Sequence, residues 1–382
     1  MRPTKTYHVR AQLSADYEVV RTDNILDLAS EELVNQGRQP GNHAQRRFIV
    51  LDQAVDAIYG KSIRAYFDHH RVECRFLVLP GGEHRKVMDS VVAVATALDS
   101  FGIDRRREPV ISIGGGVLLD LVGVATALYR RGVPHLRVPT TLIGLVDASI
   151  GVKTGINHGD HKNRLGTFQP PTAVLLDRRF LASLPERHLR NGVAEMIKLA
   201  IVRDERLFEL LEEDGDRLVE ERFQGRSPAG ERVASEVLHR SVEGMLAELE
   251  PNLWERHLDR LVDFGHSVGP TIEMLAGGDL LHGESVAIDM AMFTTVAARR
   301  GLLHDKDARR ILELLHRFAL PVDHALLDDD VVRRAMADTV RHRDGRQRLP
   351  VPVGIGRAVV LNDVTQDELR SALRHNRAEG VR

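Results

Sequence analysis

Three side chains of this sequence are of the kinds that bind a divalent metal ion. Glu195 lies in a segment with helical spacing, and Lys198 follows one turn later, so both side chains share one helix face. His266 occurs in DFGHSVGP after a predicted helix, and His282 occurs in LLHGESV at the start of another. Two histidines and one carboxylate leave an open coordination position, as a catalytic zinc site requires. The chain has 18 histidines, so each context alone also fits a histidine without a special role.

The segment 146–171, VDASIGVKTGINHGDHKNRLGTFQPP, combines charged side chains with regularly placed glycines. Asp147, Lys153, Lys162 and Asn163 all fall within it. A polar, glycine-spaced loop of this kind contributes little to a hydrophobic core. We therefore expect this segment to bind a ligand. The alternative is that it is a solvated surface loop.

Lysine is rare in this chain, because only seven of its 53 strong bases are lysines. Arginine therefore supplies the general surface charge. Four of the seven, Lys86, Lys153, Lys162 and Lys198, lie in glycine-rich segments or beside a candidate metal ligand. Lysine at these places indicates a need for a compact ammonium instead of a planar guanidinium, with chance and codon bias as the alternative.

A glycine-rich turn follows a predicted strand at 109–113 and precedes a helical segment. It contains Gly114, Gly115 and Gly116, and Asp120 lies near the start of the helix. Glycines at such a turn let the backbone approach a pyrophosphate, and the helix N-terminus favours an anion. The GxGxxG fingerprint of dinucleotide-binding folds is absent, so a turn that serves packing alone is also possible.

Two further turns carry polar side chains after predicted strands. PGGEHRK places Glu83 and Lys86 on one helix face, where an ordinary salt bridge is the alternative to ligand binding. PTTL ends another strand with the hydroxyls of Thr140 and Thr141. These hydroxyls could hold a ribose or a phosphate, or cap the next turn.

The elements that position these residues divide the chain near residue 180. Before it, apolar runs predict strands at 48–52, 75–79, 109–113, 136–142 and 172–177, with a helix at 83–103. After it, helical spacing predicts helices at 184–213, 231–250, 285–303 and 307–320, with an exposed loop at 224–230.

We therefore predict an α/β fold with a Rossmann-like parallel-sheet domain at 1–180 and a mostly α-helical domain at 181–382. Ligands of a parallel sheet gather at the carboxyl ends of its strands. The active site is then expected in the cleft between the two domains.

The composition excludes several classes of protein. Lys plus Arg come to 53 and Asp plus Glu to 55, so the chain lacks the basic excess of a dedicated nucleic-acid binder. A single cysteine, Cys74, excludes an intramolecular disulfide framework and multi-cysteine metal sites. The sequence shows no secretory signal, and its apolar runs fall far short of the ~20 residues that span a bilayer. We expect a cytoplasmic protein with no nucleic-acid or membrane partner.

Eight motifs, taken in order over residues 80–284, resemble the sugar phosphate cyclase superfamily, whose best-known member is dehydroquinate synthase. They are PGGE, GGGxxxD, PTTL, DxSxGxKTGxN, KNxxGxFxxP, AEMIK, GH and HGE. The resemblance implies bound NAD, one Zn²⁺ or Co²⁺, a small-molecule sugar phosphate substrate and a homodimer. It implies that the metal ligands are Glu195, His266 and His282. It implies that the dinucleotide is bound by Asp52, Glu83, Lys86, Gly115, Gly116, Asp120, Thr140, Thr141, Lys153 and Lys162. It implies that catalysis and substrate contacts rest on Asp147, Lys153, Asn163 and Lys198.

Three positions depart from the dehydroquinate synthase pattern. Met245, Asp259 and Pro270 stand where those enzymes carry a lysine, an arginine and a histidine that serve a substrate carboxylate. A carboxylate bound here would be unpaired, which costs several kcal/mol when it is desolvated. The natural substrate is therefore expected to lack that carboxylate. This pattern resembles the 2-epi-5-epi-valiolone synthases, the branch that cyclises sedoheptulose 7-phosphate for aminocyclitol natural products.

The resemblance implies a carbon-oxygen lyase that works by transient NAD-dependent oxidation, phosphate elimination, reduction and intramolecular aldol closure. Another sedoheptulose 7-phosphate cyclase, forming 2-epi-valiolone or desmethyl-4-deoxygadusol, would use the same substrate and stays open. A metal- and NAD-dependent polyol dehydrogenase resembling glycerol dehydrogenase also stays open, and it would release net NADH. A sugar-phosphate-binding regulator is the non-enzyme alternative.

Overall fold

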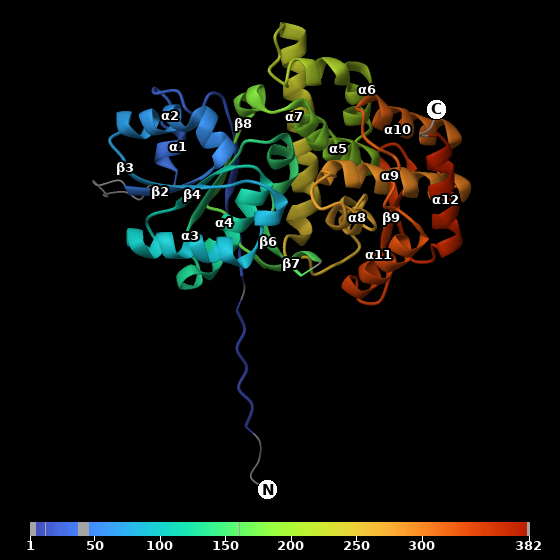
Figure 1. Ribbon diagram of the computed structural model, residues 1–382, viewed down its shortest axis with the longest axis horizontal. Helices are drawn as coiled ribbons and strands as arrows, with labels where there is room; N and C mark the ends of the chain where they lie inside the picture. Colours follow the sequence, from blue (N-terminus) through green and yellow to red (C-terminus); the bar gives the residue numbers. More distant parts are fainter. Residues whose placement is uncertain (1–4, 12, 37–45, 160, 380–382) are drawn as a thin grey trace.

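The computed structural model describes residues 5–11, 13–36, 46–159 and 161–379, which form a sheet-containing half and a helical half side by side (Figure 1). The first half is built on a six-stranded, all-parallel sheet with the order β1-β8-β5-β4-β2-β3. Its strands are β1 (Glu18–Thr22), β2 (Arg46–Asp52), β3 (Glu73–Leu79), β4 (Val110–Gly114), β5 (His135–Pro139) and β8 (Ala173–Asp177).

Helices cover both faces of this sheet, because its strands are apolar on both sides. On one face lie α1 (Glu32–Asn35) and α2 (Gln53–His69), and on the other lie α3 (Met88–Phe101) and α4 (Gly116–Leu128) (Figure 1). Along β2, Ile49 packs toward the α1 and α2 layer, and Val50 packs toward the α3 and α4 layer. The carboxyl ends of the strands therefore meet at the edge from which α2 and α4 begin.

The second half is mainly helical, and its two central helices are α5 (Glu186–Arg203) and α9 (His282–Arg299). Both are buried over most of their length. Around them lie α6 (Glu205–Glu220), α7 (Pro228–Leu249), α8 (Gly269–Leu275), α10 (Asp305–Arg317), α11 (Asp329–His342), α12 (Gln366–Glu379) and the antiparallel hairpin of β9 (Leu349–Gly354) and β10 (Arg357–Leu361). The predicted fold class, a parallel α/β sheet followed by a mostly helical half, is confirmed. Within the described ranges, no helix combines the length and the apolar character needed to span a bilayer.

The prediction of a loop over 146–171 is wrong, because most of the segment is a hairpin. A π-helical turn at Gly144–Ala148 is followed by the antiparallel strands β6 (Lys153–His158) and β7 (His161–Phe168). One glycine, Gly166, permits the close approach of the strands, since a Cβ there would lie 2.2 Å from the carbonyl oxygen of Thr154. The glycines of this segment therefore serve strand pairing as well as polar side-chain presentation.

Helix ends also differ from the sequence prediction. The segment 184–213 is two helices, because the Asp204 side chain accepts a hydrogen bond from Leu207 N at 3.0 Å and caps α6. The expected loop at 224–230 ends early, since Ser227 caps α7 and Pro228 occupies its first turn. The predicted helix at 83–103 is a short 3-10 turn followed by α3. The elements β1, α11, α12 and the β9–β10 hairpin were not predicted from the sequence.

Two glycines set the distance between the central helices and the sheet. Gly192 on α5 packs against the turn after β5, where a Cβ would lie 2.5 Å from Leu142 Cβ and 2.7 Å from Ile143 N. Gly283 on α9 packs against α5, where a Cβ would lie 2.0 Å from the carbonyl oxygen of Asn191. The sheet edge, α5 and α9 are thereby held in direct backbone contact.

We predict that Gly192→Ala lowers the free energy of unfolding by about 1–3 kcal/mol, because the added methyl group overpacks a backbone contact. Urea unfolding followed by circular dichroism measures this change. Gly244→Ala on α7 is the matched control, since its Cβ would meet only the side-chain end of Leu199. An equal loss in both variants would contradict the assignment of a backbone contact at Gly192.

Candidate active site

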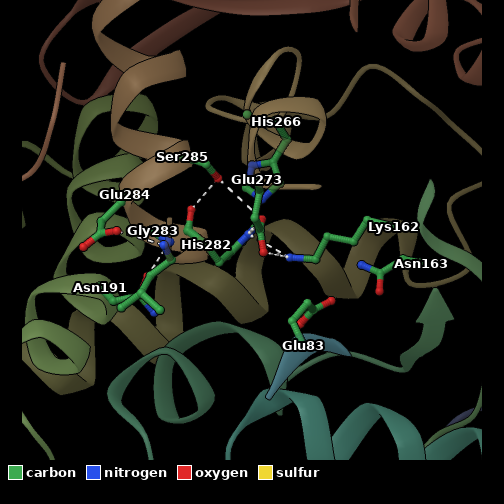
Figure 2. Close-up of polar contacts among 12 residues, drawn as sticks. Glu83, Lys162, Asn163, Asn191, His266, Glu273, His282, Gly283, Glu284 and Ser285 are labelled. Atoms are coloured by element: carbon green, nitrogen blue, oxygen red, sulfur yellow. Dashed lines mark hydrogen bonds and ion pairs between the residues drawn. The ribbon is translucent and has the colours of Figure 1, made fainter. Parts of the chain in front are cut away.

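A carboxylate and two imidazoles converge at the centre of the helical half. Glu195 lies on α5, His266 follows the 3-10 turn Leu261–Asp263, and His282 is the first residue of α9. One candidate ligand atom from each side chain lies within 4.8 Å of the other two. Figure 2 shows the two imidazole rings near one another, and their centroids are 5.2 Å apart.

Partners behind each imidazole fix which nitrogen carries the proton. Nδ1 of His266 lies 3.1 Å from the carbonyl oxygen of Phe264, and Nδ1 of His282 lies 2.8 Å from Oε2 of Glu273. Both oxygens are acceptors, so Nδ1 of each ring is the donor. Nε2 of His266 keeps its lone pair, and Nε2 of His282 would lose its proton when a metal ion binds. Nε2 of His282 lies 3.3 Å from Oε1 of Glu195. This orientation by a carboxylate or a carbonyl is typical of metal-binding histidines.

Glu195 is the most deeply buried of the three candidate ligands, at 1% exposed. In the described structure its two oxygens accept no hydrogen bond, although Lys198 and His282 lie within ion-pair distance. Burial alone would raise its pKa, but the charge of Lys198 and the contact with His282 hold that pKa well below its usual range. A buried anion with unsatisfied oxygens beside two imidazole nitrogens is a donor set that fits Zn²⁺.

The two histidines lie in opposite electrostatic environments. Burial, followed by the charge of Lys198, lowers the pKa of His266 to about 3. Burial and Lys162 also act to lower the pKa of His282, but the carboxylates of Glu273 and Glu195 raise it to about 9. A position between two carboxylates favours a cation, and a proton or a metal ion can supply that charge.

Lys198 connects the candidate metal ligands to Asp147. Its ammonium is buried, forms an ion pair with Glu195 and lies 3.8 Å from Oδ2 of Asp147. Burial raises the pKa of Asp147, and the charge of Lys198 opposes that shift. The predicted pair of Asp147 and Lys198 therefore lies together, directly beside Glu195.

Glu273 on α8 contacts the candidate site and was not predicted from the sequence. It forms an ion pair with Lys162, which reaches across from β7, and it is the acceptor for His282 (Figure 2). Nζ of Lys162 also lies 3.3 Å from Nδ1 of His282. Lys162 was predicted to contact the dinucleotide, but in this structure it faces the candidate metal ligands. An acidic residue within the short apolar stretch TIEML was the available signal.

Asp289 on α9 is a second residue that was not predicted. It is fully buried, and its Oδ2 accepts hydrogen bonds from the backbone N–H groups of Ser267, Val268 and Gly269 at 2.7, 2.5 and 2.8 Å. Three such bonds fix the backbone that follows His266. A carboxylate inside the apolar run AIDMAMF was the signal for it.

Most of the predicted dinucleotide-binding residues gather at the carboxyl edge of the sheet. Asp52 is the last residue of β2 and lies close to Gly81. A Cβ added at Gly81 would be 2.7 Å from Oδ2 of Asp52. Gly115 and Gly116 begin α4, where unpaired backbone N–H groups and the helix dipole suit a pyrophosphate. Thr140 and Thr141 follow β5 beside this turn, and the Thr140 N–H donates to the carbonyl oxygen of Gly114 at 2.9 Å.

Lys86 joins this edge to the hairpin. It is buried, and its Nζ lies 2.6 Å from Oδ2 of Asp120 and 2.6 Å from Oδ1 of Asn163. Glu83 accepts a hydrogen bond from Asn157 Nδ2 at 2.9 Å. The alternative of an ordinary helix salt bridge between Glu83 and Lys86 is therefore wrong, because each has a different partner.

Lys153 lies apart from the other predicted catalytic residues. It is at the start of β6, its side chain is 56% exposed, and its Nζ lies 2.5 Å from Oε1 of Glu255. The four predicted catalytic residues thus occupy three settings, with Asp147 beside Lys198, Asn163 beside Lys86, and Lys153 beside Glu255.

Comparison with known proteins gives matches along nearly the whole chain. Residues 76–191 match the family model described as 3-dehydroquinate synthase N-terminal, and residues 192–341 match 3-dehydroquinate synthase C-terminal. A 2-epi-5-epi-valiolone synthase of Actinoplanes sp. is 52% identical over 376 residues, covering 98% of this chain and 94% of that protein. A demethyl-4-deoxygadusol synthase of Trichormus variabilis is 36% identical over 370 residues, covering 96% and 89%.

A solved structure is similar over the same extent. ValA, the 2-epi-5-epi-valiolone synthase of Streptomyces hygroscopicus subsp. jinggangensis 5008, superimposes with a TM-score of 0.93 at 47% identity. The match covers 98% of this chain and 100% of that one. That structure contains NAD⁺ and Zn²⁺.

We predict that His282→Ala removes bound zinc and turnover together, because it deletes one of three metal-binding side chains. Glu273→Gln should keep all three and weaken zinc affinity by about 10–100-fold, since the imidazole loses the carboxylate that orients it. Chelator competition and metal analysis measure both. The exposed His304 provides the control His304→Ala, which should bind zinc normally. Stoichiometric, tight zinc in His282→Ala would refute this ligand set.

Proposed function

This chain belongs to the 3-dehydroquinate synthase family, and we propose that it converts sedoheptulose 7-phosphate to 2-epi-5-epi-valiolone and phosphate. The observation that carries the proposal is the identity of about half of all positions, over nearly the whole chain, with 2-epi-5-epi-valiolone synthases. Met245, Asp259 and Pro270, which replace basic residues of dehydroquinate synthases, support the same substrate.

The cofactors that we propose are NAD and Zn²⁺ or Co²⁺. Glu195, His266 and His282 would hold the metal ion. The dinucleotide would be held by Asp52, Glu83, Lys86, Gly115, Gly116, Asp120, Thr140, Thr141, Lys153 and Lys162. Lys162 would exchange its ion pair with Glu273 for this contact. When bound, the dinucleotide accepts and returns a hydride, and the metal ion polarises a substrate oxygen.

The substrate phosphate would be bound by Lys153, Asn163 and Lys198, which offer two ammonium groups and an amide donor. These groups come from the hairpin and from α5, and each has another partner in this structure, Glu255, Lys86 and Glu195 respectively. A phosphate bound by all three would exchange these contacts. Asp147 beside Lys198 provides a carboxylate whose raised pKa suits it to hold or release a proton near the reacting end. The eliminated phosphate itself would take the proton from the adjacent carbon.

In the described structure, the charged side chains at positions 259 and 260 already have partners. Met245 is buried in α7. Asp259 pairs with Arg348 at 2.7 Å, so its charge is already neutralised. Arg260 pairs with Asp263 at 3.2 Å. Met245, Asp259 and Pro270 offer no cation to a carboxylate, so these positions favour a neutral hydroxymethyl ketone.

The alternative functions differ in their support. The demethyl-4-deoxygadusol synthase relative is 36% identical, against 49–52% for four valiolone synthases and 38% for that of Streptomyces glaucescens. A polyol dehydrogenase is not favoured, since both family models are those of 3-dehydroquinate synthase. Product NMR separates the cyclases, and net NADH release would identify a dehydrogenase.

We further propose that the protein is a carbon-oxygen lyase that works as a cytoplasmic homodimer. The resemblance to sugar phosphate cyclases supports both statements. We propose that the chain divides into the two domains that were predicted from its sequence. These are a dinucleotide-binding domain at 1–180 and a metal- and substrate-binding domain at 181–382.

We predict that the purified protein with NAD⁺ and Zn²⁺ releases phosphate from sedoheptulose 7-phosphate and leaves 3-deoxy-arabino-heptulosonate 7-phosphate essentially untouched. Each missing charge-assisted hydrogen bond is worth about 1.5–3 kcal/mol, so three losses exceed roughly a thousandfold in discrimination. Parallel phosphate-release assays measure the ratio. Comparable rates on the two substrates would overturn the proposed substrate, and the product NMR spectrum identifies the cyclitol.

We expect that phosphate release requires a lysine at position 198 and that an arginine cannot replace it. The ammonium of Lys198 is buried between two carboxylates, and a planar guanidinium is too large for that place. Lys198→Arg should therefore lose at least about 99% of phosphate release, as a misplaced catalytic group does. Lys61→Arg on the exposed face of α2 is the control and should match wild type. Near-native turnover of Lys198→Arg would show that only the charge matters.

A further inference from the structure

A buried arginine on β5, Arg137, contacts the backbone that connects two of the proposed catalytic residues. All five residues of β5 are buried, and Arg137 is 1% exposed. Its Nη1 donates to the carbonyl oxygens of Gly151 at 2.6 Å and Ser149 at 3.2 Å. Its Nη2 donates to the carbonyl oxygen of Gln169, just after β7, at 3.3 Å.

Tyr17 supplies the remaining donor for this stretch. Its hydroxyl donates to the carbonyl oxygen of Ile150 at 2.8 Å. The three consecutive carbonyl groups of residues 149–151 therefore each accept a hydrogen bond from a side chain. Asp147 lies two residues before this stretch and Lys153 two residues after it. The path of the backbone at 149–151 therefore determines where the side chains of Asp147 and Lys153 leave the main chain.

Arg137 is an unusual choice for the interior of a sheet. In the part of the chain that the structure describes, no carboxylate lies within 4.0 Å of its guanidinium. Burial lowers its pKa, and the more distant charge of Asp120 only partly opposes this. An apolar side chain at this position would avoid the cost of burying a cation without a counter-ion. The carbonyl groups that the guanidinium holds explain why an arginine is present.

The chemistry of the guanidinium matches this arrangement of acceptors. It offers five N–H donors in one plane, so a single side chain serves three carbonyl groups from two segments. A lysine ammonium is a point charge with three donors and cannot reach all three acceptors from one place.

We propose that Arg137 is a positioning residue that holds the backbone at 149–151 and thereby places Asp147 and Lys153 for the reaction. The roles of these two residues rest on the proposed function, whereas the contacts of Arg137 do not. Arg137 acts through the backbone and touches neither substrate nor cofactor.

The test compares Arg137→Met with the matched variant Arg47→Met. Arg47 is 2% exposed, lies near the start of β2, two strands away from β5, and also donates to main-chain carbonyl oxygens, those of Arg46, Val34 and Gln36. Arg137→Met should lower kcat for phosphate release from sedoheptulose 7-phosphate by at least about tenfold, as a misplaced catalytic group does. Hydrogen exchange at the amides of 147–153 should become faster in the same variant. Arg47→Met should lower the melting temperature similarly and keep kcat within about twofold, because its contacts lie far from the site.

Two further variants keep the proposal testable if Arg137→Met does not fold. Tyr17→Phe removes one hydroxyl from the same stretch and should lower kcat by about two- to fivefold. Arg137→Lys should recover part of the kcat that Arg137→Met loses. Unchanged exchange at 147–153 in these variants, or an equal loss of kcat in Arg47→Met, would overturn the proposal. If the wild-type protein releases no phosphate from this substrate, the proposed function fails, and the exchange measurement still decides whether Arg137 holds this backbone.

Discussion

The balance of buried charge around Glu195 is the constraint on which the rest of the site depends. Three carboxylates, those of Glu195, Glu273 and Asp147, lie close to two ammonium groups, those of Lys198 and Lys162. The remaining negative charge lies beside His282, whose pKa the carboxylates of Glu273 and Glu195 raise to about 9, since a buried charge without compensation is strongly unfavourable. A divalent metal ion held by Glu195 and the two histidines would take the place of the proton on His282 as the balancing positive charge. The same balance explains why lysine persists at these positions in an arginine-rich chain.

This charge cluster also joins the two halves of the molecule. Lys162 comes from β7, Asp147 from the turn after β5, and their partners come from α8 and α5. Their separations depend on the backbone contacts of Gly192 and Gly283, because those glycines set how closely α5 and α9 approach the sheet edge and each other. The packing of the fold therefore determines how far apart the backbones that carry these ion pairs lie.

The sequence allowed the fold class and the three candidate metal ligands to be predicted, because both depend on local patterns. Alternating strands and helices have recognisable periods, and Gly-His and His-Gly-Glu contexts stand out among 18 histidines. The hairpin of β6 and β7 within 146–171 was missed, since its glycines resemble those of a loop and strand pairing is a tertiary property. Glu273 and Asp289 were missed for a different reason. Each is a single acid in an apolar stretch, and its role is defined only by partners that folding brings near.

Arg137 and Asp289 show one physical strategy applied to two loops. Asp289 is a buried anion that accepts the backbone N–H groups of 267–269, directly after His266. Arg137 is a buried cation that donates to carbonyl groups of 149–151, between Asp147 and Lys153. In each case the ion is bound mainly by peptide dipoles instead of by an opposite charge, so removing it would leave several buried backbone groups unpaired at once. The geometry of both loops is therefore coupled to the stability of the core, because the backbone of each loop is hydrogen-bonded to a side chain of the interior.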